Sequence, residues 1–148
     1  MTEPEFVVAI DTREQKPYRF PRSEVKTLAT GDYSIVGLED QVTVERKRLE
    51  ELYTVTGRDR CRFTRELDRM ARLDYAALVI ETDVPRVLRG IAFSRVSPKA
   101  VIHSLIAWSV RYRVFVFFAG DRRHANAMTY GLLEQYWRDH DDTMNQIS

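Results

Sequence analysis

Residues 31–47 read GDYSIVGLEDQVTVERK, and this stretch carries the strongest structural signal in the chain. Two short runs rich in β-branched and aromatic residues, 33–36 and 42–45, flank a loop that contains glycine and acidic residues. This pattern predicts a β-hairpin. Because side chains alternate along a strand, Glu45 and Lys47 are expected to share one face of it.

The hairpin would bring three ionisable side chains together at one edge of a sheet. Asp32 opens the first strand, so its carboxylate would lie at the same end as Glu45 and Lys47. Two carboxylates suit a hard divalent cation such as Mg²⁺, which keeps several waters and accepts phosphate oxygens as further ligands. The cation would activate a bound water, and the lysine would stabilise charge on the phosphate. The stretch therefore predicts metal-dependent hydrolysis of phosphodiesters, with the carbonyl oxygen of Arg46 as a further candidate ligand.

The rest of the chain mixes predicted strands and helices. Apolar runs predict buried strands at 6–10, 76–81 and 114–118, whereas residues 24–28 fit neither state clearly. Apolar periodicity and capping residues predict helices at 48–53, 58–73, 98–109 and 122–138. The predicted class is therefore α/β, with a central mixed β-sheet flanked by helices.

Composition favours one globular domain. The chain has 148 residues, of which 44% are hydrophobic and 30% charged, so we expect a single domain over 1–148 with a core at about 6–138 and an acidic, frayed tail at 139–148. A net charge of +1 is compatible with nucleic-acid binding if the positive charge gathers on one face. No apolar run reaches the length of a membrane span, so we expect no membrane partner and a cytoplasmic location, or a nuclear one in a eukaryote.

The central predicted helix carries five regularly spaced arginines, Arg58, Arg62, Arg65, Arg69 and Arg72. Steps of four, three, four and three residues place them on one stripe, apart from the apolar face around Phe63 and Leu67. A stripe of one charge sign predicts contact with DNA phosphates. The alternative is a solvated helix face.

Aromatic residues concentrate in the C-terminal third, namely Trp108, Tyr112, Phe115, Phe117, Phe118, Tyr130, Tyr136 and Trp137. We interpret Phe115 and Phe117 as core residues. Together the aromatics exceed what a small layer of sheet and helix needs, which favours an interface. We therefore expect a homodimer formed through the strand at 114–118 and its flanking helices.

Further short motifs accompany the hairpin. They are Asp11-Thr12-Arg13-Glu14 after the first strand, Glu51 four residues after Lys47, and Arg62-Phe63 with Glu66-Leu67 on the central helix. With these motifs the sequence resembles the nuclease domain of the XPF/Mus81 structure-specific endonucleases, the ERCC4-type domain. The signature of that family is Gly-Asp, a variable gap, Glu-Arg-Lys, three residues and Asp, and here Glu51 stands where Asp is usual.

The resemblance, which spans about residues 6–138, implies a restriction-endonuclease-like core and dependence on Mg²⁺, with Mn²⁺ as a substitute. It implies a DNA endonuclease that cleaves duplex DNA near flaps, forks or junctions, with duties in DNA repair or recombination. It also implies dimerisation through the C-terminal part of the domain.

The resemblance also assigns roles by position. Asp32 and Glu45 would bind the metal, and Lys47 would be the catalytic lysine. Asp11 and Glu14 would complete the acidic cluster, with Asp11 as a further metal ligand.

The remaining assignments concern charges around this cluster. Arg13 and Arg46 would contact phosphate or brace the carboxylates. Arg46 would count among the catalytic residues, and Arg13 among the DNA-binding residues. Arg58, Arg62, Arg65 and Arg69 would extend that DNA-binding surface. Glu51 would bind metal or support a residue that does.

Two alternatives stay open. The chain could be a non-catalytic DNA-binding or scaffolding subunit of a nuclease heterodimer, or a less structure-selective nuclease of restriction or phage DNA processing. We expect no helix-hairpin-helix or helicase domain, the parts that grip branched DNA in larger relatives. Selectivity for branches would then come from an accessory partner or from the dimer, or it would be lower.

Overall fold

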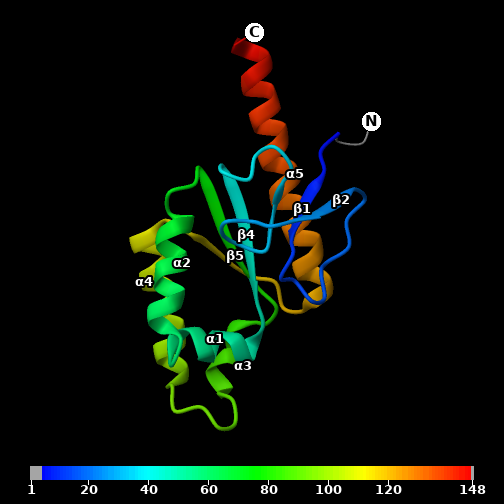
Figure 1. Cartoon of the computed structure of the whole chain (residues 1–148). Coiled ribbons are helices and arrows are strands. Elements are labelled where there is room, and N and C mark those ends of the chain that lie inside the picture. The colour runs from blue at the N-terminus through cyan, green and yellow to red at the C-terminus, as the bar shows by residue number, and fades with distance from the viewer. Residues whose placement is uncertain (1–4, 148) are drawn as a thin grey trace.

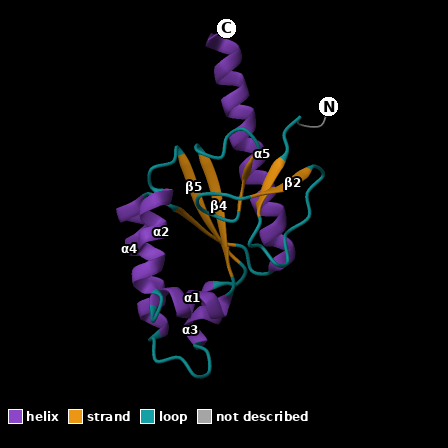
Figure 2. Ribbon diagram, in the orientation of Figure 1, coloured by secondary structure: helices purple, strands orange, loops and turns teal. Residues whose placement is uncertain are grey.

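The computed structural model describes residues 5–147, which form a mixed β-sheet with helices on both faces (Figures 1 and 2). Its strands are β1 (Val8–Asp11), β2 (Ser23–Lys26), β3 (Tyr33–Ile35), β4 (Val42–Lys47), β5 (Tyr75–Ile80) and β6 (Phe115–Phe118). Its helices are α1 (Leu49–Thr56), α2 (Arg60–Met70), α3 (Val84–Arg89), α4 (Pro98–Tyr112) and α5 (Arg122–Ile147). The predicted class, a central mixed sheet flanked by helices, is confirmed.

The strand order among the described residues is β2-β1-β3-β4-β5-β6. The predicted hairpin is the antiparallel pair β3–β4, with Tyr33 opposite Val44, and β1 is antiparallel to β3. The pairs β1–β2, β4–β5 and β5–β6 are parallel. Parallel neighbours need a crossover, which α1 and α2 provide between β4 and β5, and α3 and α4 between β5 and β6.

Each face of the sheet has its own apolar core. Leu78 and Ile80 of β5 pack beneath α1, α2 and α4, whereas Val79 belongs to the cluster that Leu133 of α5 covers from the other side. In Figure 2, α1 to α4 gather on one side of the sheet and α5 crosses the other. Val44 also lies on the α5 side, so strict alternation turns its neighbours on β4 toward α2.

Several element boundaries differ from those expected. The ambiguous segment 24–28 contributes the edge strand β2, and the short α3, which Asp83 caps by accepting from the Arg86 N–H, was not predicted. The segment expected to be a frayed tail from residue 139 continues α5 to Ile147. No helix among the described residues has the length and apolar character needed to cross a membrane.

The interpretation of Phe115 as a core residue is wrong, because 54% of its surface remains exposed. The strand that carries it, β6, is an edge strand, so no further strand covers its outer side. Phe117 does pack against the cluster on the α5 side.

Gly31 positions the residue that follows it, Asp32. Its φ of +78° is a left-handed conformation, and a Cβ there would come within 1.7 Å of Thr43 Oγ1 on β4. Thr43 is fully buried, and its hydroxyl donates to the carbonyl oxygen of Thr30 at 3.1 Å, so it has no free space into which to rotate. Glycine is therefore required at the point where the chain enters β3.

We expect Gly31→Ala to destabilise the protein by about 3 kcal/mol, which combines the left-handed backbone cost with the Thr43 collision. Gly37 offers a matched control, because its φ is +93° but a Cβ at this position would meet no other atom within 4 Å. Gly37→Ala should cost only about 1 kcal/mol. Equal losses in chemical denaturation would show that the contact with Thr43 does not constrain the entry to β3.

Candidate active site

Three neighbouring strands bring three carboxylates to the same level of the sheet. The Asp11 N–H donates to the Asp32 carbonyl oxygen at 2.9 Å, and the Asp32 N–H donates to the Val44 carbonyl oxygen at 3.0 Å. Asp11, Asp32 and Glu45 thereby line one pocket of about 470 Å³, which α2 closes from the opposite side. The sequence prediction that the hairpin gathers Asp32, Glu45 and Lys47 describes this arrangement.

The half-buried Asp32 and the buried Glu45 form a pair of like charges. Burial raises the pKa of Glu45 well above its usual range, and the neighbouring charge of Asp32 raises it further, while Lys47 opposes both effects. The two carboxyl groups are close enough to share a hydrogen bond. Asp32 is held in this position because its Oδ2 accepts the Arg46 N–H at 2.8 Å.

Lys47 places its ammonium group beside Glu45 in the pocket. Its Nζ lies 3.4 Å from Glu45 Oε2 and 5.2 Å from the centre of the Phe63 ring. Burial lowers the pKa of Lys47, but the charges of Glu45, Glu51 and Asp32 outweigh that effect and leave it raised. Lys47 therefore keeps its proton and acts through its charge and its N–H donors.

Asp11 is already engaged by its own neighbours. Its Oδ2 accepts from Arg13 Nε at 2.7 Å, and its Oδ1 accepts from the Leu28 N–H at 2.9 Å. Burial raises the pKa of Asp11, but these hydrogen bonds, the one with Arg13 above all, lower it below its usual range. Asp11 thus holds the exposed Arg13 at the rim of the pocket.

Arg46 points away from the pocket, to the opposite face of β4. Its Nη1 lies 3.1 Å from Glu14 Oε2, and its Nε lies 3.2 Å from Glu81 Oε2. The hydroxyl groups of Tyr33 and Tyr18 donate to Glu14 and Glu81, respectively, and complete the network. The geometry gives Arg46 and Glu14 the bracing role, because both side chains are largely buried.

Glu51 lies on the far side of Lys47. Its Oε1 accepts from both the backbone N–H and the Nε of Arg48, each at 3.1 Å, which caps the first turn of α1. Its Oε2 is 3.8 Å from Lys47 Nζ. Glu51 lines a second depression of about 340 Å³, which adjoins the first through Arg13, Asp32 and Lys47.

The donor set suits a cation that needs few protein ligands. Among the described residues, no three carboxylate, histidine or cysteine side chains converge as a ready-made metal site. The four expected ligands therefore do not converge on one point, although Asp11, Asp32 and Glu45 line one pocket: Asp32 and Glu45 face each other, whereas Asp11 and Glu51 are paired with arginines. Two carboxylates alone fit Mg²⁺, which is commonly held by one or two carboxylates, waters and substrate phosphates.

The arginines border two neighbouring depressions. Arg62 and Arg69 line the pocket, whereas Arg65 and Arg72 lie with Tyr112 around a separate depression that Arg69 also borders. The prediction that Arg58 belongs to the central helix is wrong, because α2 begins at Arg60 and Arg58 lies in the turn before it.

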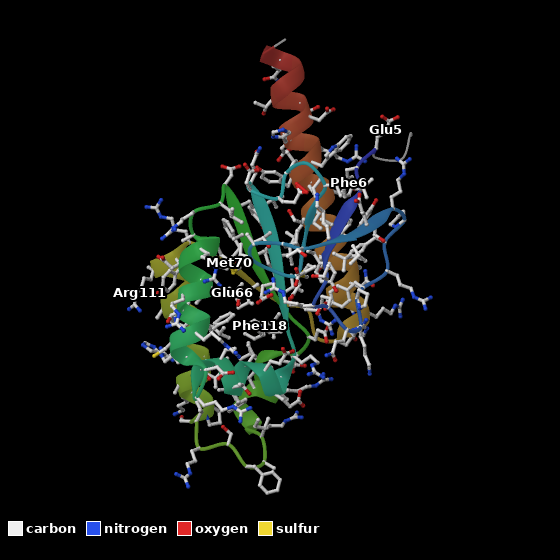
Figure 3. The ribbon with its side chains drawn as sticks, in the orientation of Figure 1. Glu5, Phe6, Glu66, Met70, Arg111 and Phe118 are labelled. Atoms are coloured by element: carbon white, nitrogen blue, oxygen red, sulfur yellow. The ribbon has the colours of Figure 1, made fainter. Side chains whose placement is uncertain are left out.

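Two acidic residues of the pocket were not among the predicted site residues. Glu66 extends from α2 toward the sheet (Figure 3), and its charge acts on both Glu45 and Lys47. Asp59 lines the same pocket and pairs with Arg62 at 2.8 Å. The signal for Glu66 was its spacing, three residues after Phe63 and one turn after Arg62, which places it on the side of α2 that faces the sheet.

Most of the chain matches a known domain family. The family model of the ERCC4 domain covers residues 10–132. The chain belongs to the ERCC4 domain family. No curated protein gives a significant match to it.

Two solved structures show the same fold as this ERCC4 domain. A structure of XPF from Aeropyrum pernix matches with a TM-score of 0.69 and 17% sequence identity, covering 88% of this chain. A structure of XPF from Aeropyrum pernix in complex with DNA matches with a TM-score of 0.68 and 21% identity, covering 90%. This chain spans 61% and 66% of the lengths of those two chains.

The Asp32–Glu45 pair predicts an unusual effect of pH and of substitution on stability. Because the pKa of Glu45 is raised in the folded state, ionising it opposes folding, so metal-free stability should fall as pH rises above about 4.3, the ordinary glutamate pKa. Asp32→Asn keeps the acceptor for the Arg46 N–H and removes the repulsion. In EDTA at pH 8 its melting temperature should equal that of the wild type or exceed it by up to about 4 °C.

Mg²⁺ should raise the melting temperature of the wild type and leave that of Asp32→Asn unchanged. Glu51→Gln is the matched control, since glutamine still caps α1 and the site retains Asp32 and Glu45. Its response to Mg²⁺ should match that of the wild type. An Asp32→Asn protein that is less stable than the wild type at every pH would contradict this description of the pair.

Proposed function

We propose that this ERCC4 domain is a Mg²⁺-dependent DNA endonuclease, with Mn²⁺ as a substitute, that hydrolyses phosphodiester bonds in branched or structured duplex DNA. The observation that carries the proposal is the Asp32–Glu45 pair beside a protonated Lys47, in a pocket whose rim holds Arg13, Arg62 and Arg69. A like charge beside the buried Glu45 costs stability, and a divalent cation from solution would offset that cost.

The residues divide the chemistry among them. Asp32 and Glu45 would hold the metal, which when bound supplies a water of lowered pKa and a Lewis acid for the phosphate. Lys47 donates hydrogen bonds to the reacting phosphate oxygens and stabilises the charge that builds up there. Arg46 keeps Asp32 in place through its backbone N–H, while its side chain fixes β4 from the opposite face. No covalent intermediate is required.

DNA is proposed as the substrate because of the charge around the pocket as well as the ERCC4 family. Arg13, Arg62 and Arg69 present guanidinium groups around the acidic centre, an arrangement that suits a phosphate backbone crossing the pocket. One of the solved structures with the same fold is described as a complex with DNA. Contacts of this kind give affinity that falls with salt and carry no base specificity.

We also propose a homodimer, which would present two active sites to one DNA. The inward side of α4 packs through Val101, Leu105 and Trp108, which leaves Ile106 and Val110 outward with 57% and 77% of their surfaces exposed. The edge strand β6 adds the half-exposed Phe115 on the other face of the sheet, where its ring stacks on Tyr75. These exposed apolar side chains on α4 and β6 favour burial against a second copy.

Cleavage of labelled linear, flap, fork and four-way DNA in Mg²⁺ tests the activity. The wild type should cut, and EDTA should abolish cutting. Lys47→Ala should lower the rate by about 10²- to 10³-fold, because it removes the charge that stabilises the transition state. Lys26→Ala, which alters an exposed lysine paired with Glu39 on the edge strand, should cut at the wild-type rate. A wild type inactive on every substrate in both Mg²⁺ and Mn²⁺ would favour the non-catalytic subunit instead.

Sedimentation equilibrium tests the dimer. The wild type should sediment at twice the monomer mass of 17.4 kDa at micromolar concentration, and the double variant Ile106→Glu with Val110→Glu should be a folded monomer. Val25→Glu alters an equally exposed apolar residue on the opposite edge of the sheet and should remain dimeric. A monomeric wild type would contradict the proposal.

A further inference from the structure

The loop between α3 and α4 exposes an aromatic ring completely. Phe93 has a relative exposure of 107%, the largest among the exposed large apolar residues, and its φ of +66° is left-handed. That conformation is uncommon for a bulky residue and costs free energy. A fully exposed ring gains no burial energy within the chain, so nothing in the chain offsets this cost.

The base of this loop is fixed, although its tip is exposed. Ile91 and Val96 on either side of Phe93 pack against the core beneath α1, α2 and α4. Val96 also lies against the α1–α2 turn, where a Cβ on Gly57 would come within 2.9 Å of Val96 Cγ2. The loop projects at the end of the molecule opposite the C-terminus (Figure 1). It is therefore an anchored projection.

The surroundings of Phe93 are positively charged. The groove of about 540 Å³ between the loop and the end of α1 is lined by Arg58 and Arg95, and no carboxylate lines it among the described residues. From residue 84 to residue 100 the sequence contains no aspartate or glutamate, and it carries Arg86, Arg89, Arg95 and Lys99. Such a stretch is complementary to a polyanion.

This groove lies next to the active-site pocket. Val55 and Asp59 line the active-site pocket, and their neighbours Thr54, Gly57 and Arg58 line the groove, so the α1–α2 turn is the wall between the two. The helix α1 has eight residues and is about 12 Å long, less than one turn of duplex DNA at about 34 Å. One DNA molecule can therefore contact both.

We propose that the α3–α4 loop selects branched DNA, with the Phe93 ring stacking on a base exposed at a branch and Arg58 and Arg95 holding the adjoining phosphates. In continuous duplex every base is stacked on its neighbours, so the ring finds a free base face only at a nick, flap, fork or junction. Base–aromatic stacking tolerates any sequence, which suits recognition of structure. The inference rests on the proposed function and assigns a contact residue to its substrate selectivity.

Binding in EDTA tests the inference without requiring cleavage. Fluorescence anisotropy should show that the wild type prefers a flap to a continuous duplex of the same sequence. Phe93→Ala should weaken flap binding about tenfold and duplex binding less than twofold, because stacking is lost only at the branch. Phe93→Tyr should restore the preference. Arg95→Ala should weaken binding to both the flap and the duplex. The slope of log affinity against log salt concentration should fall by about one, because one phosphate contact is lost.

Matched controls separate this role from a structural one. Val25→Ala, which trims an exposed apolar residue on the far edge of the sheet, should leave the flap preference unchanged. The melting temperature of Phe93→Ala should equal that of the wild type, because the ring makes no burial contribution. A 2-aminopurine at the branch base should change its fluorescence on binding wild type but not Phe93→Ala.

The outcomes distinguish the role of Phe93 from the proposed activity. Equal effects of Phe93→Ala on flap and duplex, or no effect on either, would overturn the inference and leave the ring as a contact for another protein chain. A wild type without flap preference would also overturn it. A wild type that binds flaps selectively yet cuts no DNA in Mg²⁺ would overturn the proposed activity while sustaining the role of Phe93.

Discussion

The site depends on an unfavourable interaction, the placement of the half-buried Asp32 beside the buried Glu45. Burial and the neighbouring charge of Asp32 raise the pKa of Glu45. Burial lowers the pKa of Lys47, but the charges of Glu45, Glu51 and Asp32 outweigh it and keep that pKa raised. Much of the surrounding structure holds this pair in place. Gly31 allows the backbone before Asp32 to lie against Thr43, and the Arg46 N–H donates to the Asp32 carboxylate. The register of β3 with β4 then places Glu45 beside Asp32. Strain of this kind is typical of sites that act on an external charge.

The string Glu45-Arg46-Lys47 performs two tasks because a strand alternates. Glu45 and Lys47 face the pocket under α2, while Arg46 faces the other side and joins Glu14 and Glu81 in a buried network. Truncating Arg46 would leave two largely buried carboxylates without a cation, which is costly in a low dielectric. The same three residues therefore supply the chemistry on one face of the sheet and its support on the other.

The sequence was sufficient to predict what local patterns determine. The hairpin, the shared face of Glu45 and Lys47, and the mixed sheet follow from alternation and turn residues, and the family followed from the combined motifs. It could not predict which partner each charge would take. Asp11 and Glu51 carry the right charge for metal ligands, yet Arg13 and Arg48 claim them through contacts two and three residues away. The pocket position of Glu66 and the exposure of Phe115 depend on how α2 and β6 pack, which is tertiary information.

The central claim is that Asp32 and Glu45 together hold a divalent cation. Anomalous diffraction from crystals soaked in Mn²⁺ tests it most directly. We expect one peak at about 2.2 Å from an oxygen of each carboxylate, with the remaining positions open to waters and phosphate. A peak on Asp11, Glu14 or Glu51 with none between Asp32 and Glu45, or Lys47 Nζ occupying the space between the pair, would contradict it.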